Sequence, residues 1–342
     1  MKVMNIEKQK LVNYIKKLSE AKILVVGDIA IDEMVYGDTE RISREAPVLI
    51  LQHTHTNIIL GAASNAAHNA SMINNGKVSV IGVVGDDYQA TQLIKAFEDA
   101  NVNCEYLVEE AGRKTVTKTR ISGSCSQSVT QQIVRIDRQT KAPIKKETED
   151  KIIKELEKAI PEHDAVILSD YHIGVLTSNV VNKAVELANK YNKVIVVDAQ
   201  KDLSNYKNVT SMTPNLPDTQ KFVGYELDSF EKITKAGNEI ISKTNAKAVL
   251  ITCGSDGMVV VNSDGTSEKI PVFNRSKVFD VTGAGDTVTA IYTLGLAIGA
   301  EPVYAAVIGN IAASIVIKQF GCATTTVDEI LETLEKINLK GE

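Results

Sequence analysis

The sequence predicts an α/β fold in which a mostly parallel central sheet is covered by helices on both faces and carries a small projecting β-sheet lid. Continuous apolar runs such as AKILVVGD (residues 21–28) and KVSVIGVVGDD (77–87) are followed by patterns with helical spacing. Such runs are typical of buried parallel strands, and their alternation with helices is typical of a sheet covered on both faces. Two β-rich segments, about 34–58 and 114–138, interrupt this alternation and predict the lid.

The first half of the chain supplies the leading elements of this fold. Residues 6–18 carry apolar side chains at helical spacing and predict an amphipathic helix before the first strand. Small residues at 61–64 open a second predicted helix that ends near Gly76, and residues 88–100 predict a third. Small residues at a helix entrance let a ligand approach closely, and Asn65 can donate and accept hydrogen bonds at once.

The two β-rich segments are predicted to pair into one small sheet. Segment 34–58 has apolar positions without a partner in a strand–helix–strand unit, and segment 114–138 has the alternation of a β-hairpin. His53 and His55 share one strand face, but two histidines without a third ligand are weak evidence for a metal site. The basic residues of the hairpin are candidates for contacts with an anion, with solvated strand residues as the alternative for each: Lys118, Arg120, Arg135 and Arg138.

Strand–helix alternation resumes in the second half of the chain. Apolar runs at 165–169 and 194–197 predict strands that end before Asp170 and Asp198, and residues 248–252 and 258–261 predict two more. Ligands bind beyond the carboxyl ends of the strands in open α/β sheets, so residues at these ends are candidates for a site. Further helices are predicted near 230–243, 287–298 and 302–318, the last two closing the chain.

Composition narrows the class of protein. The chain has 342 residues, a net charge of −5 and 44% hydrophobic residues, as expected of an ordinary globular protein without a nucleic-acid surface. Its four cysteines lie far apart and form no C-x-x-C pair, which indicates reduced thiols in the cytoplasm. The charged N-terminus lacks the apolar core of a signal peptide, and no run approaches the ~18 apolar residues of a membrane span. We therefore expect a cytoplasmic protein with neither a nucleic acid nor a membrane as partner.

The densest group of chemically functional residues is DVTGAGDT (280–287), which opens an apolar helical run. At a helix start, unpaired N–H groups and the positive dipole end form an anion site, and glycines let a ligand approach the main chain. An aspartate in an anion site makes sense if Asp286 takes a proton from a hydroxyl while the amides around Gly283, Ala284 and Gly285 hold the phosphoryl group under attack. The dipole would keep Asp286 ionised. The alternative is an ordinary glycine turn with Asp286 as a helix-start residue.

The whole motif D-x-x-G-A-G-D resembles the C-terminal signature of the ribokinase-like (PfkB) carbohydrate kinases. A longer collinear set of segments resembles the kinase domain of ADP-heptose synthases: VVGDIAIDEMVYGDTERISREAPV (25–48), residues 61–65, TKTR (117–120), QQIVRID (131–137), SDY (169–171), TPN (213–215) and Asn310. The resemblance implies one ribokinase-like domain over residues 1–342, a three-layer sandwich with a projecting lid, and a homodimer formed through that lid. It implies an ATP-dependent kinase that phosphorylates O1 of D-glycero-β-D-manno-heptose 7-phosphate.

The resemblance also implies roles for individual residues. Asp286 would be the catalytic base, and Gly283, Ala284 and Gly285 the anion hole. Asp32, Gly61 and Asn65 would hold hydroxyls of the sugar, with a turn residue as the alternative for Asp32. Lys118 and Arg120, two of the basic hairpin residues named above, are our candidates for further contacts with the substrate. Residues that would face ATP are Thr252, Gly254, Gly257 and Asn310, while Asn215 and Asp218 would order Mg²⁺ and phosphate through water. The cofactors implied are therefore ATP and Mg²⁺, and a monovalent cation such as K⁺ is left open.

Four positions depart from the heptose kinase pattern. Ile173 and Gln200 stand where D-Y-x-K-G and D-P-K have lysine, although His172 and Lys201 lie one position away. Ala62 replaces the second glycine of G-G-A-x-N, and Asp218 replaces the glutamate of N-x-x-E. The first two changes bear on whether the acceptor carries a phosphate. The second, nucleotidyltransferase domain of bifunctional synthases has an H-x-G-H motif with no counterpart here, so a stand-alone kinase is expected.

Three other functions compete with this hypothesis. A ribokinase-like kinase for a different sugar, sugar phosphate or nucleoside would account for the missing lysines. A non-catalytic protein that senses sugar or nucleotide is disfavoured, because a sensor needs neither a base such as Asp286 nor a metal-binding residue such as Asn215. A dinucleotide-dependent oxidoreductase should show G-x-G-x-x-G after an early strand, and Gly27-Asp28 does not provide it.

Overall fold

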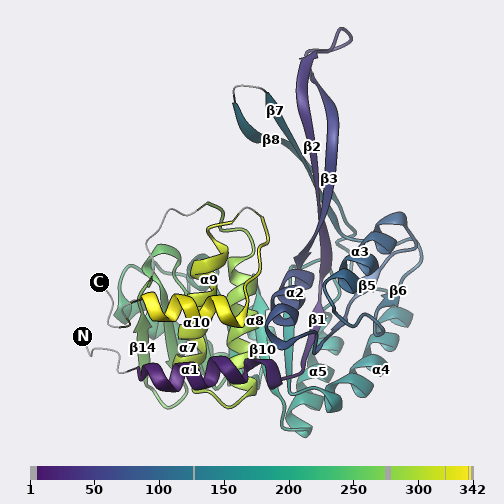
Figure 1. Ribbon diagram of the computed structural model, residues 1–342. Coiled ribbons are helices and arrows are strands. Elements are labelled where there is room, and N and C mark those ends of the chain that lie inside the picture. The colour runs from purple at the N-terminus through teal and green to yellow at the C-terminus, as the bar shows by residue number, and fades with distance from the viewer. Residues whose placement is uncertain (1–5, 126–127, 274–278, 320, 338, 340–342) are drawn as a thin grey trace.

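The computed structural model describes residues 6–125, 128–273, 279–319, 321–337 and 339. Within them, an eight-stranded sheet has the order β14-β13-β12-β11-β10-β9-β1-β4, parallel from β4 to β12 and antiparallel at β13 and β14 (Figure 1). Its strands are β1 (Ile23–Gly27), β4 (Val78–Ile81), β9 (Ala165–Asp170), β10 (Val194–Ala199), β11 (Ser211–Met212), β12 (Ala248–Thr252), β13 (Met258–Asn262) and β14 (Ser267–Ile270). A separate short pair is β5 (Val83–Val84) with β6 (Val108–Glu109).

Helices cover both faces of this sheet. One face packs against α1 (Lys8–Lys17), α2 (Ala63–Asn74), α3 (Tyr88–Asp99), α8 (Ala284–Ala297), α9 (Pro302–Val316) and α10 (Val327–Lys336). The other packs against α4 (Lys146–Glu162), α5 (Ser178–Lys190), α6 (Leu216–Val223) and α7 (Phe230–Thr244). Among the described residues, no helix has the length and apolar character needed to cross a bilayer.

Successive residues of the central strands face opposite cores. In β1, Ile23 and Val25 are buried in one core, whereas Leu24 and Val26 are buried in the other. Side chains alternate between the two faces of a strand, so a strand covered on both sides must be apolar throughout. This explains the continuous apolar runs in the sequence, and the predicted α/β sandwich is confirmed.

A four-stranded sheet projects from the body and forms the lid (Figure 1). Its strand order is β3-β2-β7-β8, with β2 (Ile29–Ile42), β3 (Leu49–Ala62), β7 (Thr117–Cys125) and β8 (Ser128–Arg138). β2 pairs with β3 in antiparallel and with β7 in parallel orientation, and β7 with β8 is antiparallel. The predicted pairing of the two β-rich segments is thus confirmed, although β2 and β3 extend further toward the body than the expected 34–58.

The C-terminal part of the fold differs from the prediction. The sequence suggested that the helices at 287–298 and 302–318 close the chain, but α10 follows them. Thr326 and Glu329 form a capping box at the start of α10, and Ile330 and Leu334 bury its apolar face. This S/T-x-x-E arrangement before an apolar pattern is the signal in the sequence that marks the start of α10. Helix α8 also begins at Ala284 rather than Thr287, so Asp286 lies in its first turn.

Candidate active site

The side chain of Asp286 is held at the start of α8 by two hydrogen bonds. Asn65 Nδ2 donates to Asp286 Oδ2 at 2.7 Å, and the Tyr171 hydroxyl donates to Asp286 Oδ1 at 2.7 Å. Gly283 is the N-cap residue with φ of 79°, and a Cβ there would lie 2.5 Å from Asn65 Nδ2. Glycine is therefore required at this position both for its backbone conformation and for the contact between Asn65 and Asp286.

Burial sets the acidity of this carboxyl group. Asp286 is 5% exposed, and desolvation raises its pKa from the ordinary value of 3.8 to about 6. The hydrogen bonds from Asn65 and Tyr171 and the positive charge of Lys118 oppose this rise in pKa, while the charge of Asp32 adds to it. At neutral pH the carboxyl group is mostly ionised. Its pKa is nevertheless much closer to 7 than expected if the helix dipole alone determined it.

Asp32, Lys118 and Arg120 lie on one face of the lid sheet. Asp32 pairs with Lys118, Met34 pairs with Arg120, and directly paired residues point to the same side. Arg120 Nη2 lies 3.6 Å from Asp32 Oδ2. Asp32 is 5% exposed, and its Oδ1 has no hydrogen-bond partner among the residues that the structure describes. A buried carboxylate oxygen without a donor is suited to accept a hydrogen bond from a ligand hydroxyl.

The remaining cations of the hairpin have other partners. Arg138 pairs with Thr117 on the opposite face of the lid, where its Nη1 donates to Thr119 Oγ1 at 3.1 Å and lies 3.8 Å from Glu33 Oε2. Arg135 lies on the same face of the lid as Asp32, Lys118 and Arg120, here called the inner face. Its guanidinium, however, binds both carboxylate oxygens of Asp137. Lys118 and Arg120 are therefore the two hairpin cations best placed for an anion beside Asp32.

The candidate histidine pair also has local partners. The His55 ring stacks on Tyr36 with centroids 4.5 Å apart, and His53 Nε2 lies 2.9 Å from Thr56 Oγ1. Within the described parts of the chain, no group of three or more His, Cys, Asp or Glu residues could hold a metal ion.

A cavity of about 140 Å³ lies at the carboxyl ends of the strands, next to Asp286. Asn215 and Asp218 border it, at the start of α6, where Asn215 Oδ1 accepts a hydrogen bond from the Asp218 amide at 2.8 Å. Asp198 borders it as well, and burial together with the charges of Asp286 and Asp218 raises the Asp198 pKa to about 7. This concentration of buried negative charge, with carboxylate and carboxamide oxygens, fits a hydrated Mg²⁺ ion.

A larger cavity of about 680 Å³ adjoins the other side of the α8 N-terminus. Thr252 and Gly285 line both cavities, so the start of α8 stands where they meet. Asn310 Nδ2 donates to the Pro271 carbonyl at 2.8 Å, and Gly257 has φ of 87° with a Cβ position only 2.1 Å from the Ile270 carbonyl oxygen. All four residues expected to face ATP line this larger cavity: Thr252, Gly254, Gly257 and Asn310.

Two site residues were not proposed as such from the sequence. Tyr171 binds Asp286 directly, and Asp28 holds the segment that carries Tyr171, because its carboxylate accepts hydrogen bonds from the amides of Tyr171, Ile173 and Val175. Both follow the ends of central strands, β9 and β1, which was the available signal. Burial, opposed by these three donors, raises the pKa of Asp28 to about 6.

The structure also locates the departures from the heptose kinase pattern. Ile173 is buried in a small apolar cluster at the base of the lid together with Ala30, Ala62 and Val116. Ala62 has φ of 51°, an unusual conformation for a residue other than glycine, and its methyl group lies in the same cluster. Gln200, in contrast, lines the 140 Å³ cavity.

Comparison with known proteins agrees with this arrangement. A family model for pfkB family carbohydrate kinases matches residues 20–329. Among curated proteins, the chain is 36% identical over 317 residues to "Bifunctional protein HldE" of Trichlorobacter lovleyi, covering 92% of this chain and 63% of the relative. It is 36% identical to the protein of the same name from Desulfatibacillum aliphaticivorans, covering 93% and 64%. The chain therefore spans less than two thirds of the length of these relatives.

Solved structures share the fold at lower identity. Arabidopsis thaliana ribokinase complexed with ribose and ATP superposes with a TM-score of 0.69 and 16% identity, over 92% of this chain and 99% of that one. Phosphofructokinase-2 from Escherichia coli in complex with potassium superposes with a TM-score of 0.72 and 18% identity, over 92% and 99%. At these identities the likeness establishes a ribokinase-like fold.

Proposed function

The chain belongs to the pfkB family of carbohydrate kinases, and we propose that it transfers the terminal phosphoryl group of ATP to a sugar hydroxyl. The acceptor that we propose first is O1 of D-glycero-β-D-manno-heptose 7-phosphate. One observation carries the proposal: Asp286 lies in the first turn of α8, where a cavity of about 680 Å³ for the nucleotide meets the carboxylate-lined cavity. With ATP as the donor, we place the reaction in the cytoplasm.

The site residues divide the reaction between them. The acceptor hydroxyl gives its proton to Asp286 while its oxygen bonds to the terminal phosphorus, and the bond from that phosphorus to ADP breaks. The amides of Gly283 and Gly285 at the start of α8 hold the oxygens of the transferred group, whose negative charge the helix dipole favours. The Ala284 amide, also predicted for this role, donates to the Val281 carbonyl at 3.2 Å. Asp32 and Asn65 orient the sugar, and Lys118 and Arg120 offer positive charge on the inner face of the lid.

Mg²⁺ bound with ATP would neutralise phosphate charge and align the terminal phosphoryl group. Asn215 and Asp218 are the residues that would hold this ion, through water molecules. The carboxamide of Asn215 is oriented by the capping hydrogen bond to the Asp218 amide at 2.8 Å. Asp218 Oδ1 lies 3.1 Å from Lys221 Nζ; the side chain of Lys221 is 72% exposed and can turn into solvent when another cation binds Asp218.

Oligomeric state and monovalent-cation dependence belong to the same proposal. The lid carries exposed apolar side chains on several strands, which supports a homodimer formed through it: Ile42, Leu49, Ile133, Val134 and Ile136. A monovalent cation such as K⁺ is tested by comparing turnover in potassium and tetramethylammonium salts. Sedimentation of the protein at several concentrations tests the dimer.

A kinase for a different sugar is the second candidate. The buried position of Ile173 favours it, because an apolar side chain packed under the lid cannot neutralise a sugar phosphate as lysine does. A substrate panel separates the two candidates: coupled ATP turnover with heptose 7-phosphate, unphosphorylated heptose and other sugar phosphates. Preference for heptose 7-phosphate supports the first proposal, and preference for another acceptor supports the second.

Substitution of Asp286 tests the mechanism independently of the acceptor. Asp286→Asn should bind ATP normally and lose about 10²-fold or more in turnover, as expected when a positioned base is lost. Near-normal turnover would remove Asp286 from the role of base. No ATP consumption by the unmodified protein across a broad sugar panel would instead favour a sensing function.

A further inference from the structure

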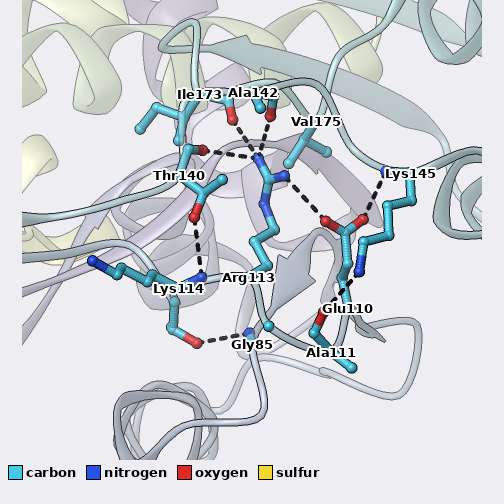
Figure 2. Close-up of polar contacts among 12 residues, drawn as sticks. Gly85, Glu110, Ala111, Arg113, Lys114, Thr140, Ala142, Lys145, Ile173 and Val175 are labelled. Atoms are coloured by element: carbon cyan, nitrogen blue, oxygen red, sulfur yellow. Dashed lines mark hydrogen bonds and ion pairs between the residues drawn. The ribbon is translucent and has the colours of Figure 1, made fainter.

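A buried arginine outside the cavities connects the lid to the segment that carries Tyr171. The side chains of Arg113 and Glu110 are 3% and 6% exposed, and Arg113 Nη1 lies 3.4 Å from Glu110 Oε1 (Figure 2). Neither residue lines the cavities beside Asp286. A buried ion pair is costly to desolvate and often no more stable than an apolar pair, so stability alone is a weak explanation for its presence.

The partners of Arg113 come from three parts of the chain. Arg113 Nη2 donates to the carbonyl oxygens of Thr140 and Ala142 at 3.1 Å each, and to the carbonyl oxygen of Ile173 (Figure 2). Arg113 itself lies just before β7, and residues 139–145 follow β8, so these two stretches are the roots of the lid hairpin. Glu110 also accepts a hydrogen bond from the Lys145 amide at 2.8 Å, which is a second contact with the stretch that follows β8.

Segment 171–175, which contains Ile173, is held from several sides, and one of these contacts is made by the Ile144 amide after β8, which donates to the Gly174 carbonyl at 3.1 Å. Asp28 accepts hydrogen bonds from three of its amides, at 2.9, 2.9 and 3.2 Å, and Arg113 binds its carbonyl at Ile173. His172 and Gly174 have φ of 56° and 97°, so the segment has a sharply turned backbone that side-chain anchors must maintain. Its first residue is Tyr171, whose hydroxyl donates to Asp286 Oδ1 at 2.7 Å.

We propose that Arg113 is a positioning residue for phosphoryl transfer: by binding both hairpin roots and segment 171–175, it holds the Tyr171 hydroxyl against the catalytic carboxylate of Asp286. The inference rests on the proposed function, since it assigns to Asp286 the role of base. Tyr171 stabilises the ionised form of Asp286 and fixes the direction of its free lone pairs. The same guanidinium binds the lid, so displacement of the hairpin and of the Tyr171 hydroxyl are linked.

Other charged groups face Asp286 and remain unchanged in the test variants. Lys118 on β7 and Asp32 on β2 face it from the lid, Asp198 faces it from β10, and Cys322 faces it from the loop after α9. Asn65 on α2 supplies the second hydrogen bond. A change in the pH profile caused by substitution at position 113 must therefore reach Asp286 through an altered structure, and segment 171–175 provides the direct connection.

The test is a double-mutant cycle between Arg113 and Tyr171, read from turnover as a function of pH. Tyr171→Phe should lower kcat about tenfold at about pH 8, the loss expected for a hydrogen bond to a charged group. It should also move the acid limb of the kcat profile upward by about one pH unit, because the ionised carboxylate loses a donor. Arg113→Lys keeps the charge but loses the planar guanidinium and its several N–H donors. It should change kcat and the acid limb in the same directions as Tyr171→Phe.

The outcome of the cycle decides between positioning and plain structural support. The inference predicts that Arg113→Lys adds little to the changes caused by Tyr171→Phe when the two are combined. It is overturned if Arg113→Lys lowers thermal stability while leaving kcat and the acid limb unchanged, or if its effects add fully to those of Tyr171→Phe. Lys145→Ala is the matched control, since its Nζ binds Ala111 in the same network without contacting segment 171–175.

Two further variants keep the test decisive. If Arg113→Lys does not fold, the double variant Glu110→Gln/Arg113→Gln replaces it, because it removes both buried charges together and retains hydrogen-bonding groups. Asp286→Asn is measured in parallel. Active Asp286→Asn would contradict the role of Asp286 as base, on which this inference rests. Absence of ATP turnover by the unmodified protein would contradict the proposed function itself, whereas inactive Asp286→Asn with an additive cycle would contradict only the role of Arg113.

Discussion

Substitution of Asp286, the proposed base, should make the folded chain more stable. Asp286 is buried, and its pKa is raised from 3.8 to about 6 because desolvation outweighs the hydrogen bonds and positive charge around it. Asp286→Asn removes this buried charge but preserves its size. The carboxamide oxygen can accept the hydrogen bond from Asn65, and its NH₂ group can donate to the Tyr171 hydroxyl oxygen. The substitution therefore removes a cost of folding, and both neighbours keep a hydrogen bond, in which the Tyr171 hydroxyl changes from donor to acceptor.

The expected gain follows from the pKa. A folded-state pKa above the unfolded value means that the folded chain binds the proton more tightly, so this carboxyl group costs stability as pH rises from 3.8 through about 6. At about 1.4 kcal/mol per pKa unit, the cost approaches ~3 kcal/mol at about pH 8. It falls to ~1 kcal/mol at about pH 4.5, where the unfolded carboxyl is largely ionised but the folded one is not.

Urea unfolding of both proteins at about pH 8 and about pH 4.5 measures this difference directly. Most other titrating groups behave alike in both proteins, so their contributions cancel in the comparison. The exception is Asp198, whose pKa the charge of Asp286 raises, so its cost of ionisation also falls in the variant and widens the difference at about pH 8. Asp286→Asn should be more stable at the higher pH, with most of that advantage lost at the lower pH. Equal stability at about pH 8, or an advantage that does not change with pH, would refute the argument that desolvation of Asp286 carries the effect.

Three further predictions concern the same site. Turnover of the unmodified protein should decline about tenfold per pH unit below about pH 6, and a flat profile to pH 5 would exclude Asp286 as the titrating base. Gly283→Ala should lose about 10²-fold in kcat, because its Cβ would lie 2.5 Å from Asn65 Nδ2 and displace this donor from Asp286. Unchanged kinetics would show that Asn65 can move aside without cost and that its contact with Asp286 is not needed. Arg120→Ala should raise KM for a phosphorylated acceptor about tenfold with KM for ATP unchanged. An equal rise for both substrates would place Arg120 outside the acceptor site, despite its 3.6 Å approach to Asp32.

The sequence predicted those parts of the fold for which local pattern and tertiary environment agree. Strands covered on both faces must be apolar at every position, so β1 and β9 were recognisable from their continuous apolar runs. The lid strands were recognisable because they interrupt the strand–helix alternation. Helix α10 is harder to predict, because only two of its apolar residues, Ile330 and Leu334, are fully buried.

Much of the candidate site was predictable because its residues lie at strand ends and helix starts, positions that a motif identifies. Asp286 and Asn215 are of this kind. Contacts between side chains distant in sequence were not predictable. The hydrogen bond between Tyr171 and Asp286 joins residues 115 positions apart. The ion pair of Arg113 and Glu110 is local in sequence, but the carbonyl groups that Arg113 also binds come from distant segments. Only the packed structure shows that Arg113 and Asp286 share segment 171–175.

The departures at positions 62 and 173 are best understood as one change in packing. Ala62 has φ of 51° and ψ of −135°, a sparsely populated conformation that costs about 1–3 kcal/mol for a residue with a Cβ. Its methyl group is buried beside Ile173, Ala30 and Val116, and burial of one such group contributes about 0.8 kcal/mol, which offsets part of that strain. A lysine at position 173 would bring a charged side chain into this apolar cluster under the lid. Glycine at position 62 would leave Ile173 without one of its neighbours. The apolar residues at positions 62 and 173 therefore suit each other, and a phosphate on the proposed acceptor would need positive charge from other residues. We propose Lys118 and Arg120, which share one face of the lid with Asp32, for this role.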